Sequence, residues 1–184
     1  MRCSTCYRSA AAALAVALLP VRAWSAQAGV AAAWVPKHVQ FVYQGFTTRY
    51  SCDGLRDKIE DMLLKLGARD LKVREQPCST PAGVPDPFPG VRVTMQVLVP
   101  AAQAKKGAPQ VRAHWQRVVL APSETEVDYG GECELIEQFK RTFLPLFATR
   151  KTHFRATCVP HQLTLGTSLS TEALVPDKPA VKRH

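Results

Sequence analysis

The stretch that decides the fold is C-D-G-L-R-D-K-I-E-D-M-L-L-K-L-G-A-R, residues 52–69, which returns later as C-E-L-I-E-Q-F-K-R-T-F-L-P-L-F-A-T-R, residues 133–150. Laid over each other without a gap, the two stretches place cysteine on cysteine, apolar residues on apolar residues and Arg69 on Arg150. A second cysteine follows each stretch, Cys78 after the first and Cys158 after the second. The chain therefore looks like one unit written twice.

Both stretches predict an amphipathic helix, because their apolar residues recur every three or four positions. Ser51 or Asp53 can accept hydrogen bonds from the first turn of the earlier helix, and Gly67 is well placed to end it. In the later helix, Pro145 should kink or terminate the last turn. The apolar stripes are Leu55, Ile59, Met62, Leu63 and Leu66 in the first helix, and Leu135, Ile136, Phe139, Phe143, Leu146 and Phe147 in the second.

Strand-like runs surround both helices. They cover residues 39–48, 71–74, 91–99, 111–120, 152–157 and 163–169. The order predicts an α+β fold of two β-α-β-β halves, about residues 38–99 and 111–170. We expect the halves to form a mixed sheet with two helices on one face, since a strand that returns after a crossover helix usually runs parallel to the first.

Residues 1–28 have the features of a secretory signal peptide. Arg2 and Arg8 precede an apolar run over residues 10–19, and Ala26-Gln27-Ala28 offers a small-x-small cleavage site. The run is only about half of the roughly 20 residues needed to cross a bilayer, so a retained membrane helix is the less favoured interpretation. We expect a periplasmic or secreted protein, cleaved near Ala28.

Cleavage would leave a chain of ordinary length for a single α+β domain, residues 29–175, followed by a flexible basic tail, residues 176–184. The leader contains three arginines and no acid, so its removal lowers the formal net charge from +9 to +6. A mildly basic domain suits contact with anionic envelope polymers or lipid head groups. Nucleic acid is disfavoured, because no aromatic-basic alternation is present.

Four cysteines remain after cleavage, and an exported chain favours two disulfides among three possible pairings. A helix of about 14 residues climbs about 21 Å, and a returning strand of about seven residues brings the chain back to the helix start. This geometry predicts Cys52–Cys78 and Cys133–Cys158, with pairing between the halves as the alternative. A zinc site is disfavoured, because no two of these cysteines have C-x-x-C spacing.

The candidate binding residues lie in loops and at the helix starts. Residues 77–90 form a long loop rich in proline, and residues 121–131 form an acidic one. Parallel crossovers would bring both loops to the carboxyl edge of the sheet, where such sheets bind ligands. The residues expected to gather there are Arg49, Tyr50, Asp53, Tyr129 and His161. All but Tyr129 also have a structural interpretation: Asp53 as a helix cap, His161 as a turn residue, and Arg49 and Tyr50 as cover for a disulfide.

The sequence supplies no catalytic residue and predicts neither a metal nor a cofactor. Nucleophile elbows, zinc-binding histidine pairs, phosphate-binding loops and dinucleotide-binding glycine patterns are all missing from it. The histidines are widely separated, and none has a second histidine or cysteine four residues away on a clear helix.

Several stretches resemble a family of small secreted proteins of Gram-negative bacteria to which no activity is assigned. They are G-F-T-T-R-Y-S-C-D-G-L (45–55), L-G-A-R-D-L-K-V (66–73), C-E-L-I-E-Q-F (133–139), L-P-L-F-A-T-R (144–150) and C-V-P-H-Q (158–162). The resemblance implies export and an envelope address, and it supplies no residue role.

Three hypotheses follow for the function. The favoured one is a non-enzymatic exported domain that binds an envelope component or a protein partner through the proline-rich loop and the neighbouring edge. The second is a small periplasmic hydrolase or transferase that uses His161 with Asp53 or Tyr129. The third is a structural protein that self-associates through an open sheet edge.

Overall fold

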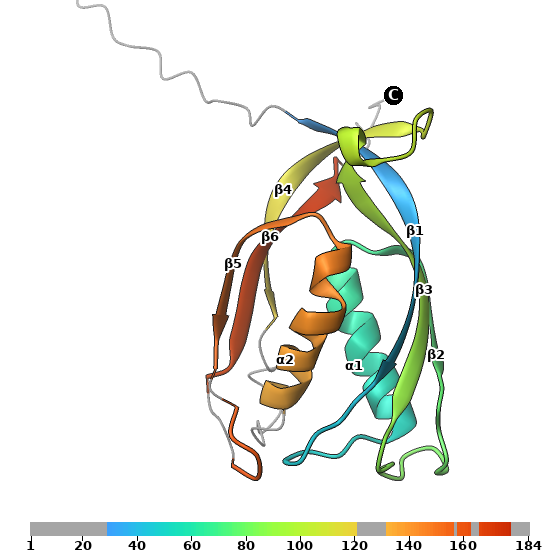
Figure 1. The fold of residues 1–184 in the computed structure, drawn as a ribbon, viewed down its shortest axis with the longest axis vertical. Coiled ribbons are helices and arrows are strands. Elements are labelled where there is room, and N and C mark those ends of the chain that lie inside the picture. The colour runs from blue at the N-terminus through green and yellow to red at the C-terminus, as the bar shows by residue number, and fades with distance from the viewer. Residues whose placement is uncertain (1–28, 121–131, 157, 163–165, 178–184) are drawn as a thin grey trace, which may run out of the picture.

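A computed structural model describes residues 29–120, 132–156, 158–162 and 166–177 (Figure 1). The predicted signal peptide, Tyr129 and most of the predicted tail lie outside these residues. Six strands and two α-helices make up the fold, with two short 3₁₀ helices between them. The elements are β1 (Val30–Val42), α1 (Cys52–Lys65), β2 (Arg69–Glu75), β3 (Gly90–Pro100), η1 (Ala101–Gln103), β4 (Gln110–Leu120), α2 (Glu132–Thr142), η2 (Leu144–Leu146), β5 (Thr149–Arg155) and β6 (Ser168–Pro176). The fold is α+β, as the sequence predicts.

The strands form one open sheet in the order β2-β3-β1-β4-β6-β5, and each neighbouring pair is antiparallel. The prediction of a mixed sheet is therefore wrong. The reason is that β3 inserts between β1 and β2, while β6 inserts between β4 and β5. The strands on either side of each helix run in the same direction but never pair with each other.

The sheet consists of two three-stranded parts joined by a short ladder. We call β2, β3 and β1 the first wing, and β4, β6 and β5 the second wing. Residues Val30 to Ala33 of β1 pair with Gln110 to Ala113 of β4, and no other pairing joins β1 to β4. Beyond this ladder the wings diverge, and both helices lie between them in Figure 1.

The main hydrophobic core fills the space between the wings. The α1 stripe meets inward residues of the first wing, such as Phe41 and Val93, while α2 contributes Phe139. Phe143, just beyond α2, stacks on Phe139 at 5.0 Å and meets Phe41 edge-on at 5.3 Å. Burying a large apolar side chain contributes about 1.5–3 kcal/mol, so this shared core is what holds the wings to the helices.

The helix ends follow the predicted signals. The Ser51 hydroxyl accepts a hydrogen bond from the Gly54 amide at 3.2 Å, which makes Ser51, and not Asp53, the cap of α1. Gly67 follows the helix with φ +87°, a conformation that costs glycine little. The later helix stops at Thr142, and Pro145 lies in the 3₁₀ turn that follows, as predicted.

Two strands differ from their predicted limits. Strand β1 begins at Val30 and ends at Val42, whereas the alternation predicts residues 39–48. Its early part, A-A-A-W-V, gives no alternating pattern, and where it pairs with β4 the successive residues Ala32 and Ala33 are both buried. Strand β6 covers Ser168–Pro176 and so extends into the predicted tail, beyond the predicted run at 163–169.

Both predicted disulfides are confirmed. Cys52 begins α1 and bonds to Cys78, with a Cα–Cα distance of 6.0 Å. Cys133 lies in the first turn of α2 and bonds to Cys158, with a Cα–Cα distance of 5.6 Å. In each case the strand after the helix returns the chain to the start of that helix. Among the described residues, we find no helix long and apolar enough to span a bilayer.

The disulfides should contribute comparably to stability, since they span 26 and 25 residues. Replacing Cys133 and Cys158 together by alanine should lower the free energy of unfolding by about 3.5 kcal/mol, because the open chain gains loop entropy in the unfolded state. Urea denaturation measures this loss. The matched double variant of Cys52 and Cys78 should lose a similar amount, and a loss confined to one pair would contradict the shared explanation.

Candidate functional site

The predicted site lies at the end of the molecule where the proline-rich loop meets the start of α1. The Asp53 carboxylate accepts a hydrogen bond from the Gly83 amide at 2.9 Å. This bond is the main reason that the pKa of Asp53 lies below its ordinary value, and a hydrogen bond with Ser51 adds to it. Asp53 therefore fastens the proline-rich loop to α1.

Asp86 organises the proline-rich loop from within. One carboxylate oxygen accepts from the Ser79 amide at 2.8 Å and the Ser79 hydroxyl at 2.6 Å, and the other accepts from the Phe88 amide at 2.9 Å. The side-chain hydrogen bond from Ser79 is the largest of several that lower the pKa of Asp86 to about 2. The Asp86 amide donates to the Tyr50 carbonyl at 3.0 Å, so the loop is tied to the segment before α1.

Glu134 does the same for the segment between β1 and α1. This buried side chain of α2 accepts from the amides of Phe46 and Thr47, at 2.8 and 3.1 Å, and from the Tyr43 hydroxyl at 3.3 Å. Burial is the main cause that raises the pKa of Tyr43, and the neighbouring Glu134 carboxylate raises it further. Together these bonds fix the path of the segment 43–50.

The remaining predicted residues are placed as follows. Tyr50 is half-buried and meets the Tyr43 ring edge-on at 5.1 Å, while Arg49 is exposed. The His161 amide donates to the Thr47 hydroxyl at 3.1 Å. The rings of His161 and Phe46 meet at 5.8 Å.

The structure thus brings Arg49, Tyr50 and Asp53 together at the start of α1, with His161 against the preceding segment. Within the described residues, no hydrogen bond joins His161 to Asp53. Asp86 also lies close to Cys52 and Cys78, but those two sulfurs are bonded to each other and are not available as metal ligands. The geometry at this end describes loops held in place by carboxylates.

A second surface is the sheet face turned away from the helices, which we call the outer face. Inward residues such as Val93 and Val39 pair across the strands, so the residues between them point outward. In the described part of the chain, the outer face carries eight Lys or Arg and only two carboxylates. The cations are Arg69, Lys72, Arg74 and Arg92 on the first wing and Arg117, Arg150, Lys151 and Arg155 on the second, and the acids are Asp70 and Glu172.

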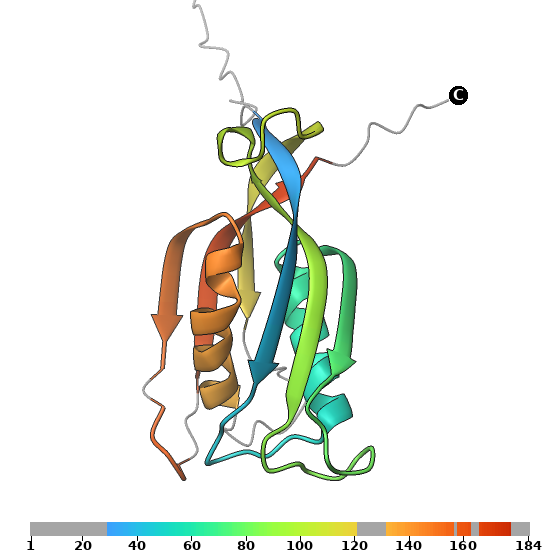
Figure 2. The ribbon, with the colours of Figure 1, turned by 45° about the vertical axis from the view of Figure 1, so that its right-hand side comes forward.

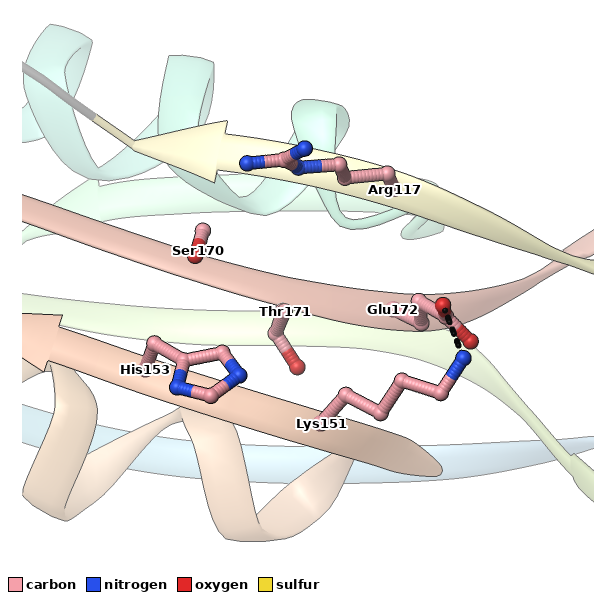
Figure 3. Close-up of a pocket in the computed structure, with 6 residues that line it drawn as sticks. All are labelled: Arg117, Lys151, His153, Ser170, Thr171 and Glu172. Atoms are coloured by element: carbon pink, nitrogen blue, oxygen red, sulfur yellow. Dashed lines mark hydrogen bonds and ion pairs between the residues drawn. The ribbon is translucent and has the colours of Figure 1, made fainter.

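The second wing has a shallow groove of about 230 Å³ on this face, shown in Figure 3. Glu172 of β6 lies at one end, where it accepts hydrogen bonds from Lys151 at 2.9 Å and Arg150 at 2.5 Å. These bonds lower the pKa of Glu172, with Lys151 the larger cause. Arg117 is opposite Glu172 on β4, and His153 is opposite Ser170, so the groove is open and cationic.

The two wings share a further arrangement on the outer face. Arg69 stacks over Trp34 at 4.3 Å in the first wing, and Arg150 stacks over Trp115 at 4.5 Å in the second. Each arginine is followed by a bulge in an edge strand, with a residue at positive φ: Asp70 at 50° and Lys151 at 51°. The tryptophans cover a second, smaller apolar cluster around Ala32, Ala113, Leu98 and Leu174.

Sequence reasoning missed the outer face, because the polar residues of a half-buried strand look alike whether they bind a ligand or only water. The signal that was present is the sign of their charge: β2 reads R-D-L-K-V-R-E and β5 reads T-R-K-T-H-F-R. Only the register shows that these cations face the same side as Arg92 and Arg117.

No family model, curated protein or solved structure matches this chain.

The role of Glu134 in fixing the path of the segment 43–50 can be tested by mutation. Glu134→Gln should lower the free energy of unfolding by about 1–3 kcal/mol, because the neutral amide oxygen accepts the two backbone hydrogen bonds more weakly than a carboxylate and the acceptor for the Thr47 hydroxyl is lost. Hydrogen exchange of the Phe46 and Thr47 amides should become faster. The control Glu137→Gln changes a carboxylate of the same helix outside this network, and an equal effect there would contradict the assignment.

The low pKa of Asp86 predicts how the free energy of unfolding depends on pH. Its folded pKa of about 2 lies below the unfolded value, so its contribution is present above about pH 4 and is lost as pH falls through 2. Asp86→Asn should flatten the fall in stability over that window, measured by denaturation at a series of pH values. Ser79→Ala removes the leading cause of the shift and should move the loss to higher pH; an unchanged profile in both variants would refute this role.

Proposed function

We propose that this chain is an exported, disulfide-stabilised binding domain that holds an anionic polymer of the cell envelope on the outer face of its sheet. The observation that carries the proposal is the charge of that face, eight Lys or Arg against two carboxylates among the described residues. Such a surface attracts polyanions at long range and binds them more weakly as salt rises.

The cations of α1 are held in ion pairs. Arg56 pairs with both Asp57 and Glu75, Lys58 pairs with Glu132, and Lys65 pairs with Asp61. By contrast, no ion pair is found within the described ranges for five cations of the outer face: Lys72, Arg74, Arg92, Arg117 and Arg155. Their positive charge is available to a partner on that face.

The shape of the outer face favours a polymer over a bilayer. The wings lie on either side of the helices, so their outer faces point to different sides of the molecule (Figures 1 and 2). A planar bilayer can contact one wing at a time, whereas a flexible chain can follow the outer face from one wing to the other. Simultaneous contact with both wings would add avidity.

Support for export comes from the sequence of residues 1–28 and from the two disulfides. We also propose that the chain is built from two copies of one β-α-β-β unit. The matching disulfides, Trp–Arg stacks and bulges support this.

The rival functions receive less support. A hydrolase site would use His161 with Asp53 or with Tyr129. Asp53 is bound to Gly83 and His161 packs against Phe46, while Tyr129 lies outside the described residues. Self-association through a sheet edge would use β2 or β5, and both edge strands carry a bulge, which disfavours pairing with another strand.

The proposal predicts selective loss of polyanion binding. The purified protein should bind fluorescent polyphosphate and polygalacturonate, less tightly at about 200 mM than at about 50 mM NaCl. The triple variant Arg117→Gln, Lys151→Gln, Arg155→Gln should bind at least about tenfold more weakly, since several charge-assisted contacts are lost. Fluorescence anisotropy measures both.

The matched control is Lys65→Gln, Lys105→Gln, Lys106→Gln, which removes the same charge away from the outer face. It should weaken binding by less than about threefold, the effect of net charge alone. An equal loss in both triple variants, or no binding by the unaltered protein, would overturn the proposal.

A further inference from the structure

Two arginines lie directly opposite each other on the outer face of the first wing. Arg74 of β2 pairs in register with Arg92 of β3, and both side chains are exposed. Side chains in such positions have their Cβ atoms about 4.5–5.5 Å apart, and like charges there destabilise a sheet. Among the described residues, neither arginine has a carboxylate partner.

The surroundings add to the positive charge. Lys72 lies two residues before Arg74 on the same face, opposite Thr94. The nearest acid in sequence, Glu75, belongs to the opposite face, where it accepts a hydrogen bond from Arg56 at 2.6 Å. Three cations therefore occupy neighbouring outward positions, and the outer-face carboxylate of this wing, Asp70, is bound to Arg69 and Gln96.

Polar groups border these cations on the next strand. Gln40 of β1 pairs in register with Arg92, and the His38 ring contacts the Thr94 hydroxyl at 3.3 Å. The cluster therefore lies on three paired strands, which hold its backbone positions fixed. A site on strands is held more firmly than one on loops.

The second wing has the same strand pairing but lacks the pair of opposed arginines. At the position that corresponds to Arg74 it has Arg155, and opposite Arg155 stands Ser168 rather than an arginine. Its other edge cations, Arg150 and Lys151, both pair with Glu172. The fold thus accommodates an uncharged residue at the position of Arg92, so backbone pairing does not require the second arginine.

We propose that Lys72, Arg74 and Arg92 form a binding site, which we call the seat, for a phosphate monoester group. This proposal specifies the ligand chemistry of the outer face and rests on the polymer-binding function proposed above. A phosphate monoester carries close to two negative charges at neutral pH and three strong acceptor oxygens. Arginine guanidinium groups bind such an oxyanion in bidentate fashion, and a dianion between two opposed arginines replaces their repulsion with two attractions. A single carboxylate has half the charge and suits the seat less well.

The first experiment is thermal unfolding of the purified, disulfide-bonded protein in sodium phosphate and in sodium chloride of equal ionic strength. Arg92→Gln should raise Tm in chloride by about 1–3 °C, because it removes the opposed charge. The unaltered protein should have a higher Tm in phosphate than in chloride, and Arg92→Gln should lose that difference. Arg74→Gln should behave in the same way, and the control Lys106→Gln should keep the values of the unaltered protein.

The source of the phosphate is tested with three probes: inorganic phosphate, a dextran that carries phosphate monoester groups, and phosphatidylcholine vesicles with and without phosphatidic acid. Binding of the phosphorylated dextran at least about tenfold tighter than that of polygalacturonate at equal charge, with the preference lost in Arg92→Gln, supports a polymer source. Vesicle binding that needs phosphatidic acid and Arg92 supports the seat and assigns it to a lipid head group. An unchanged phosphate effect in Arg92→Gln, or a lower Tm of that variant in chloride, would overturn the seat.

Failure of the seat and failure of the proposed function give different results. If only the seat is wrong, both polymers bind with equal affinity and Arg92→Gln changes neither selectivity nor the phosphate effect on Tm. If only polymer binding is wrong, the phosphate effect on Tm remains and depends on Arg92, while neither polymer binds.

Discussion

The short ladder between β1 and β4 is the constraint on which the rest of the structure depends. Four residue pairs are enough to make the sheet continuous, and too few to keep its two wings in one layer. The wings diverge, and the helices enter the space between them, where one apolar core serves both wings. Small residues allow the strands to cross closely, with Ala32 and Ala113 fully buried on the side away from the helices. The curved outer face follows directly from this junction.

Two buried carboxylates then fix the end of the molecule that the sequence identifies as its site. Glu134 of α2 accepts a hydrogen bond from the Phe46 amide, and Asp86, within the proline-rich loop, accepts one from the Phe88 amide, so a carboxylate fixes the backbone of each segment. Buried carboxylates need such partners, because an unpaired charge in the interior is costly. The acids at this end therefore have a structural explanation that is complete without a substrate.

The elements with local signals could be predicted from the sequence. Apolar spacing fixes the helix faces, Ser51 and Gly67 mark the ends of α1, and the rise of helix and strand brings Cys78 back to Cys52. The order of the strands in the sheet could not be predicted. β3 lies between β1 and β2, and no residue of β3 marks that position in the sequence. The parallel sheet edge assumed for Arg49, Tyr50, Asp53, Tyr129 and His161 was therefore an unsafe guide to a ligand site. The role of Glu134 was hidden for the same reason, since its partners are about 90 residues away in sequence.

The two wings allow structural needs to be separated from other needs within one chain. A tryptophan covered by an arginine and a bulge after that arginine occur in both wings, so these features belong to the way the sheet bends near the junction. The charges farther down the strands differ: the second wing places Arg155 opposite Ser168, while the first wing places Arg74 opposite Arg92. A feature that the backbone requires should recur where the backbone recurs. The opposed arginines do not recur, and like charges directly opposite each other disfavour strand pairing, so a role outside folding is their most economical physical explanation.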